Sequence, residues 1–231
     1  TSTVSANTDA GFSIVSYTGN GVGYGSGGAT VGHGLSVAPE FILVKRRDSS
    51  SGWVSYHPNQ DSGTNGERGY MHLNETQAYA DYHEIWADTK PTASVFKMGS
   101  AGNLNANNGT YVAYCFHSVD GYSKVGSYTG NGSSNGPFIY TGFRVGFMMI
   151  KRTDSTGPWL IFDSGREPYN DGDLSVLSAD STAAEPSSGG TTNDIVSNGF
   201  KVRGTTDRNT NGGTYIYLAF AETPFKYSNA R

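Results

Sequence analysis

The sequence predicts an all-β protein made of two tandem antiparallel β-sandwich repeats, of the jelly-roll or immunoglobulin-like kind, with little helix. Two observations support this prediction. Three blocks of sequence recur in the same order in both halves of the chain. Within each half, short apolar or alternating runs are separated by clusters of Gly, Asn, Asp and Ser, a pattern typical of sandwiches and barrels. A single larger sandwich with pseudo-twofold symmetry is the alternative.

The repeat sets the expected domain boundaries, because self-similarity of this length indicates a duplicated structural unit. The blocks are SYTGNG at 16–21 and 127–132, a KR-DS-W pattern at 45–53 and 151–159, and GTY at 109–111 and 213–215. We therefore expect one sandwich over residues 1–118 and a second over 119–231. Each is then about 110 residues long, a normal size for one sandwich.

Seven strands are predicted in each copy from the hydrophobic pattern and the turn residues between runs. In the first copy they span 12–18, 29–34, 40–47, 52–57, 70–74, 94–99 and 111–118. In the second copy they span 122–129, 138–142, 146–152, 159–163, 174–178, 199–204 and 214–221. The one candidate helix covers 75–86, where aromatic residues fall at helical spacing, and a structured loop is the alternative.

Two runs in each copy are apolar at consecutive positions, although a strand with one wet face should alternate. They lie at 41–44, 111–116, 147–150 and 215–220. Contiguous apolar surface of this kind usually marks an interface. We therefore expect the second face to be covered by the other copy or by another subunit, as in a homo-oligomer, with a trimer favoured.

Composition and charge exclude several classes of protein. The formal net charge is −4 and only 16% of the residues are charged, so the chain lacks the positive field that nucleic-acid binders need. No apolar stretch is long enough for a membrane helix, and no membrane insertion is expected. The single Cys115 cannot form an intrachain disulfide and lies within an apolar strand, where it should pack as a small buried hydrophobe.

Acidic residues gather in two equivalent loop regions, at 61–88 and 163–185. Asp171-Gly172-Asp173 has a spacing that suits Ca²⁺, but no full ligand pattern accompanies it, and exposed solubilising loops are the stronger interpretation. No cofactor is therefore expected, with Ca²⁺ kept as a possibility. A glycosidase needs two convergent carboxylates, and no motif singles out such a pair, so we expect no enzymatic activity. All five His lie in the first copy without paired zinc-ligand spacing.

The best candidate binding surface is an aromatic-rich loop in the first copy. Its counterpart at 177–198 contains no aromatic residue, so the shared fold does not demand these side chains. Sugars are held by aromatic faces and neutral hydrogen-bonding groups, which this loop supplies. The alternative is that Trp86 packs in the core, as we expect for Trp53 and Trp159. The candidate ligand-binding residues are Tyr70, Tyr79, Tyr82, His83 and Trp86.

Residues 31–46, with the sequence VGHGLSVAPEFILVKR, resemble the HGL…P…IIVK strand–turn–strand module of bacteriophage tail and appendage proteins. The segments at 86–96 and 109–114 resemble the same proteins. Across nearly its whole length the chain is similar to an uncharacterised β-rich repeat family found at the C-terminal end of virion proteins of marine phages. The second copy departs from this pattern, because it reads YTGF at 140–143, so any role of His33 would belong to the first copy only.

The resemblance implies a virion protein, assembled in the bacterial host cytoplasm and carried in the phage particle, whose partners are other virion subunits. Together with the loop composition, it predicts the terminal region of a tail fibre or other appendage that attaches to a host-surface glycan or protein. A purely structural head-decoration or tail-shaft protein is the alternative. A polysaccharide depolymerase is the third hypothesis.

Overall fold

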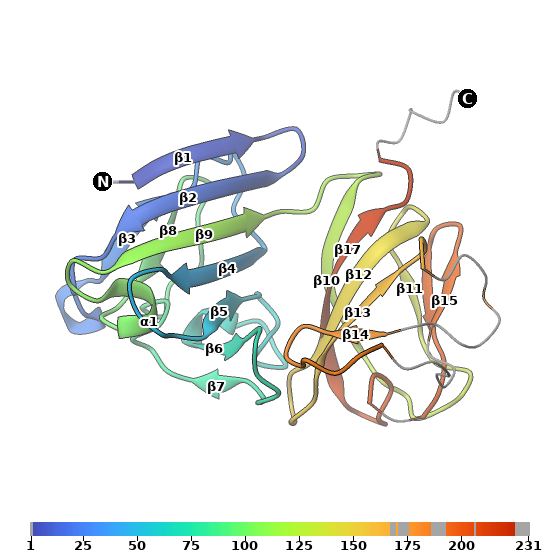
Figure 1. Cartoon of the computed structure of the whole chain (residues 1–231). Coiled ribbons are helices and arrows are strands. Elements are labelled where there is room, and N and C mark those ends of the chain that lie inside the picture. The colour runs from blue at the N-terminus through green and yellow to red at the C-terminus, as the bar shows by residue number, and fades with distance from the viewer. Residues whose placement is uncertain (1, 167–169, 171–175, 186–192, 206, 225–231) are drawn as a thin grey trace. The chain divides into compact units, whose positions relative to one another are not determined.

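The computed structural model describes residues 2–166, 170, 176–185, 193–205 and 207–224, and this part of the chain is all-β (Figure 1). It divides into two compact units, Thr1–His117 (unit 1) and Ser118–Arg231 (unit 2). The predicted boundary differs from this division by one residue. Several antiparallel sheets form a sandwich-like arrangement with little helix, which confirms the predicted fold class.

Unit 1 consists of a large sheet and a two-stranded ribbon. The large sheet has the order β1-β2-β9-β4-β5-β6-β7, and the ribbon pairs β3 with β8. The strands are β1 (Ser2–Asn7), β2 (Phe12–Thr18), β3 (Ala29–Gly32), β4 (Phe41–Arg46), β5 (Trp53–Tyr56), β6 (Gly69–His72), β7 (Ala80–Asp81), β8 (Val95–Met98) and β9 (Thr110–Phe116). The short helices are η1 (Tyr24–Ser26), η2 (Gly66–Arg68) and α1 (Gly102–Asn105).

Unit 2 repeats this plan with a five-stranded sheet and a three-stranded sheet. Their orders are β10-β17-β12-β13-β14 and β11-β16-β15. The strands are β10 (Ser123–Thr129), β11 (Phe138–Tyr140), β12 (Val145–Arg152), β13 (Trp159–Asp163), β14 (Leu177–Ser178), β15 (Asn193–Val196), β16 (Gly199–Val202) and β17 (Thr214–Ala221). The predicted strand at 174–178 lies partly outside the described residues.

The two units hold the same aromatic stack at the same place. Tyr17 and Tyr111 lie opposite each other on β2 and β9, with ring centroids 5.0 Å apart and planes 13° apart. Tyr128 and Tyr215 lie opposite each other on β10 and β17, with centroids 4.9 Å apart and planes 10° apart. This agreement in strand register and ring geometry supports the duplication predicted from the sequence.

Each unit also holds a buried asparagine that ties two loops together. The Oδ1 atoms of Asn105 and Asn209 accept the backbone N–H groups of Asn20 and Asn131, each at 2.9 Å. Both Asn105 and Asn209 are fully buried. The repeat therefore includes the residues just before each GTY block, a signal that the sequence analysis did not use.

The turn at 33–35 keeps its geometry in unit 2 although its sequence changes. The N–H of Leu35 donates to His33 Nδ1 at 3.1 Å, and the N–H of Phe143 lies 3.4 Å from Thr141 Oγ1. The glycine between them has a φ of 73° in unit 1 and 89° in unit 2. The histidine therefore fills a structural position that a threonine fills in the second unit.

Two sequence expectations need correction. Residues 75–86 form no helix but turns around the short strand β7, so the structured-loop alternative applies. The strands β1, β7 and β15 were not predicted. For β1 the reason is that the strand is exposed along most of its length, so it shows no alternation of buried and exposed side chains.

The apolar runs of the two units differ in how many of their side chains are buried. In β9 the side chains of Tyr111, Ala113 and Cys115 are buried, while those between them are only half-buried, so this strand alternates after all. In β17 the side chains of Ile216 and Leu218 are also buried, at 1% and 4% exposure. Both faces of β17 are therefore buried, whereas β9 buries only one.

Cys115 packs as predicted, because it is a free, fully buried thiol in the core of unit 1. Burial raises the pKa of this thiol to about 12. None of the helices in the described ranges has the length and apolar character needed to cross a bilayer.

We expect the stability of unit 1 to fall as the pH decreases through the range just below 6.5. His33 is fully buried, with Nε2 3.0 Å from the Thr92 carbonyl oxygen and Nδ1 accepting from Leu35, so the neutral ring fits both contacts. Burial lowers the pKa of His33, which means that the unfolded chain binds the proton more readily than the native state. The stabilisation that depends on neutral His33 should therefore be fully present above the unfolded pKa of about 6.5 and be lost as the pH falls below it.

Urea unfolding at pH 7.5, 6.5 and 5.5 measures this effect. His33→Thr, which introduces the residue that unit 2 uses in the same turn, should reduce the dependence on pH. An equal dependence in the wild type and in His33→Thr would show that the proton is taken up elsewhere.

Candidate functional site

The structure brings three of the five predicted site residues together on the surface of unit 1. The ring centroids of Tyr70 and Tyr82 are 6.5 Å apart, and those of Tyr82 and His83 are 6.2 Å apart. Tyr24, which the sequence analysis did not select, extends this group with its ring 5.2 Å from that of His83. We call Tyr24, Tyr70, Tyr82 and His83 the ring cluster.

The ring cluster is accessible to a ligand at one end and anchored at the other. Tyr24 and Tyr82 are each 44% exposed, and His83 is exposed as well. Tyr70 is partly buried and packs against the core of unit 1. Partly exposed aromatic rings on an anchored base can contact the apolar face of a sugar.

Two predicted site residues do not belong to this surface. Trp86 is 1% exposed and packs in the core, with its ring edge-on to those of Tyr56 and Phe96. Its place as a ligand-binding residue is therefore corrected, and the packing alternative is right. Tyr79 lies over the backbone of Gly69, where a Cβ would come within 2.7 Å of its ring. Trp159 is a core residue as expected, whereas Trp53 is only half-buried and stacks on Tyr114.

The carboxylate of Glu84 holds the exposed end of the ring cluster in place. Its Oε2 accepts the backbone N–H of Tyr24 at 3.0 Å, the backbone N–H of Ser100 at 2.6 Å and the Ser100 hydroxyl at 2.8 Å. These hydrogen bonds lower the pKa of Glu84, because they stabilise the charged form. One carboxylate thus joins η1, the turn that carries Tyr82 and His83, and the loop after β8.

Several acidic residues in the described parts of the acidic loop regions have a structural partner. Asp61 accepts the N–H groups of Gly63 and Asn65, as in an Asx turn. Asp180 accepts the N–H of Trp159 at 2.7 Å. Within the described ranges no three His, Cys, Asp or Glu side chains are grouped so that they could hold a metal ion. Asp171 and Asp173, the candidate Ca²⁺ pair, lie outside the described residues.

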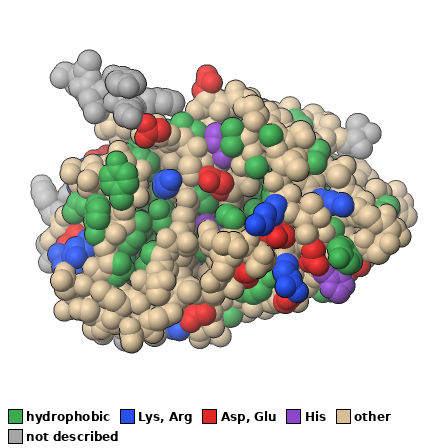
Figure 2. Space-filling model, turned by 180° about the vertical axis from the view of Figure 1, so that it is seen from behind, with side chains coloured by type: hydrophobic (Ala, Val, Ile, Leu, Met, Phe, Trp, Pro, Cys, Tyr) green, Lys and Arg blue, Asp and Glu red, His purple; other side chains and the backbone are tan. Residues whose placement is uncertain are grey.

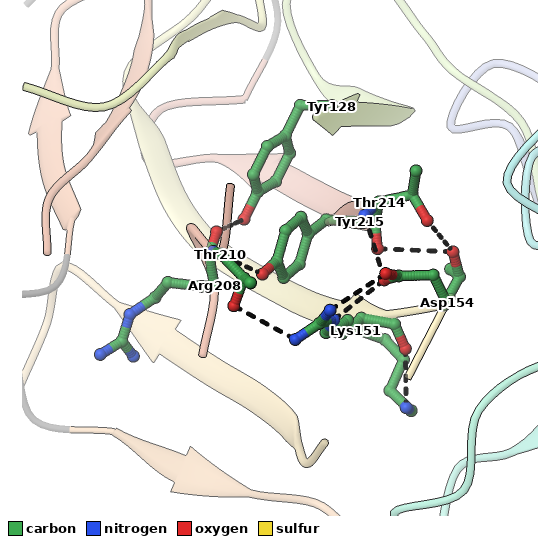
Figure 3. Close-up of polar contacts among 9 residues, drawn as sticks. Tyr128, Lys151, Asp154, Arg208, Thr210, Thr214 and Tyr215 are labelled. Carbon is green, nitrogen blue, oxygen red and sulfur yellow. Dashed lines mark hydrogen bonds and ion pairs between the residues drawn. The ribbon is translucent and has the colours of Figure 1, made fainter. Parts of the chain in front are cut away.

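A second candidate site is a pocket of about 210 Å³ in unit 2. It lies where β12 ends and where β13 and β17 begin, and the connection from β16 to β17 forms one wall. Arg208 and Tyr215 line it, and Figure 3 shows the Arg208 side chain pointing away from the polar contacts around Tyr215. The sequence analysis missed Arg208, although comparison of the two copies, which places it opposite Leu104, could have found it.

On the face drawn in Figure 2, acidic, basic and apolar side chains are interspersed. Such a mixed surface does not select a partner by long-range attraction, so recognition would depend on local contacts.

A family model described as "Domain of unknown function (DUF7483)" matches residues 1–224, so the chain belongs to this family. No curated protein and no solved structure matches the chain.

Proposed function

We propose that this member of the DUF7483 family is a non-enzymatic virion protein that attaches a phage to its host. It would form the terminal region of a tail fibre or other appendage and bind a glycan or protein on the host surface. The resemblance of residues 31–46 to the module of phage tail proteins supports the virion part of this proposal. The site on unit 1 supports the attachment part.

The ring cluster is the observation that carries the proposal. Its exposed members, Tyr24 and Tyr82, offer aromatic rings and hydroxyl groups beside the imidazole of His83. Stacking on such faces supplies affinity for the apolar side of a sugar, and the polar groups orient it. Tyr24 and Tyr82 are each 44% exposed, so a ligand can reach both rings.

The ring cluster is also prearranged for binding. Glu84 fixes Tyr24 and Ser100 through three hydrogen bonds, and the N–H of Tyr82 donates to the Arg68 carbonyl at 2.8 Å. A surface that is already ordered loses less conformational entropy when a ligand binds. Several copies in a homo-oligomer, for which we favour a trimer, would then raise the weak affinity of one site by avidity.

A structural role is the second candidate, and the outer face of the large sheet in unit 1 favours it. Ile14 lies opposite Tyr114, which in turn lies opposite Leu43, so an apolar row crosses three strands. Ile14 is 40% exposed and the other two side chains are half-buried. A head-decoration or tail-shaft subunit would pack this row against a neighbouring subunit.

We expect Tyr82→Ala to weaken binding of the full chain to host cells or host polysaccharide at least tenfold, which corresponds to about 1.4 kcal/mol. The cause is loss of an exposed ring at the centre of the ring cluster. Tyr140→Ala is the matched control, since Tyr140 is 65% exposed on β11 and belongs to no part of the ring cluster. The measurement is a cell-binding or immobilised-polysaccharide assay at low and high salt.

Equal binding by Tyr82→Ala and Tyr140→Ala would contradict attachment through the ring cluster. Burial of the ring cluster between subunits of the intact virion would favour the structural role instead. Release of reducing ends or unsaturated sugars from host polysaccharide would show a depolymerase.

A further inference from the structure

One position that lines the pocket in unit 2 differs in chemistry between the two copies of the repeat. In unit 1 the hydroxyl of Tyr17 donates to the carbonyl oxygen of Leu104 at 3.0 Å, and in unit 2 the hydroxyl of Tyr128 donates to that of Arg208 at 2.8 Å. Leu104 and Arg208 are therefore equivalent residues. Leu104 is fully buried in its core, whereas Arg208 lines an open pocket.

The guanidinium of Arg208 lies over a ring that is covered differently in unit 1. It lies 5.5 Å from the ring centroid of Phe162. The equivalent ring in unit 1, that of Tyr56, packs edge-on against Trp86. A cation thus contacts the ring of Phe162, whereas in the first unit an indole contacts the equivalent ring. A cation–π contact of this kind orients the guanidinium plane.

Arg208 carries a positive charge that its surroundings only partly balance. No carboxylate in the described ranges forms an ion pair with its guanidinium, and burial lowers its pKa. The exposed Asp207 at the rim acts on it electrostatically without such a contact. A half-buried guanidinium loses hydration and gains by binding an anion.

The other basic group of the pocket is already neutralised. Arg152 binds both carboxylate oxygens of Asp154, at 2.9 and 3.0 Å, and donates to Thr210 Oγ1 at 3.1 Å (Figure 3). The equivalent pair in unit 1, Arg46 and Asp48, is formed in the same way. Among the described residues that line the pocket, Arg208 is therefore the one left to attract an anion.

The remaining walls suit the carbon skeleton of a small organic ligand. Ile150, Pro158, Leu160 and the ring of Tyr215 line the pocket, and Thr156 adds a hydroxyl. The volume of about 210 Å³ is below the roughly 300–1,000 Å³ of pockets for drug-sized ligands. The space therefore suits one sugar unit or a group of similar size.

We propose that this pocket binds the carboxylate of an acidic sugar, with Arg208 as the carboxylate-binding residue. A planar carboxylate matches the two parallel N–H groups of a guanidinium. Its single negative charge balances the unpaired arginine of the pocket, whereas a phosphate monoester carries about −1.5 to −2 and would be repelled more strongly by Asp207. The choice of a sugar acid rests on the proposed attachment to host glycans, while the carboxylate specificity rests on Arg208 alone.

Calorimetric titration of the full chain with methyl glucuronide, methyl glucoside and inorganic phosphate tests this proposal. Methyl glucuronide should bind at least tenfold more tightly than methyl glucoside, which lacks the carboxylate, and phosphate should compete only weakly. Arg208→Leu should weaken binding of methyl glucuronide at least tenfold. This variant should fold, because unit 1 has leucine at the same position, and its circular dichroism spectrum checks that. Arg47→Leu, an exposed arginine in unit 1, is the control and should bind within twofold of the wild type.

The proposal would be overturned if methyl glucuronide did not bind, or if methyl glucoside bound with equal affinity. It would also be overturned if phosphate competed as strongly as methyl glucuronide binds, or if Arg208→Leu bound methyl glucuronide as tightly as the wild type. The test is separate from that of the attachment proposal, because Tyr82→Ala should leave binding of methyl glucuronide to unit 2 intact. Loss of host binding in Tyr82→Ala without any methyl glucuronide binding would refute the pocket and leave the ring cluster standing.

Discussion

Trp86→Ala is expected to lower the free energy of unfolding of unit 1 by about 3–5 kcal/mol, the range measured for removal of large aromatic side chains from protein cores. Trp86 is 1% exposed, and its ring packs against those of Tyr56 and Phe96, at centroid distances of 5.5 and 6.3 Å. Removing the indole leaves a cavity between these rings, which rigid strands on either side cannot close. Urea denaturation followed by circular dichroism measures the loss.

Two further variants separate packing from other effects at this position. Trp86→Phe keeps a ring in the cavity and should cost clearly less than the alanine variant. Trp53→Ala removes a half-buried ring on the outer face of the large sheet and should cost about 1–2 kcal/mol, since less apolar area is lost. A Trp86→Ala variant no less stable than Trp53→Ala would contradict the core placement of Trp86.

Asn209→Ala is expected to destabilise unit 2 by about 3 kcal/mol. The Asn209 Oδ1 accepts the N–H of Asn131, and its Nδ2 donates to the carbonyl oxygens of Ser133 and Gly204 at 2.7 and 2.8 Å. The side chain is fully buried, so alanine would leave an N–H and two carbonyl groups without partners, and a buried unsatisfied group costs about 1–3 kcal/mol. Partial entry of water into the gap limits the total.

The exposed partner of this contact provides a matched control. Asn131→Ala removes one side-chain amide from the same hydrogen-bonding group at an exposed position and should cost less than about 1 kcal/mol. Asn105→Ala should reproduce the larger loss in unit 1, because its contacts are the same. Similar stabilities of Asn209→Ala and Asn131→Ala in urea unfolding would show that the buried amide does not hold the loops together.

Asn105 and Asn209 show what local sequence patterns can and cannot predict. Asn105 and Asn209 stand four residues before equivalent glycines, so the repeat marks them as a pair. Their burial depends on loops some eighty positions away in the chain, which no local pattern reports. The aromatic spacing around Trp86 suggested a helical face, but backbone turns in that segment send Trp86 into the core and Tyr82 to the surface.

The sequence by itself determined the duplication, the all-β class and most of the strands, because these depend on alternation and turn residues within a few positions of each other. Only the tertiary structure decided which side chains meet. It brought Tyr24 beside His83 across a long stretch of chain, placed β1 as an exposed edge strand, and opened a pocket beside Arg208 where the first unit buries Leu104. The physical reason is that long-range packing decides between burial and exposure, while a local pattern reports only which residues could form a face.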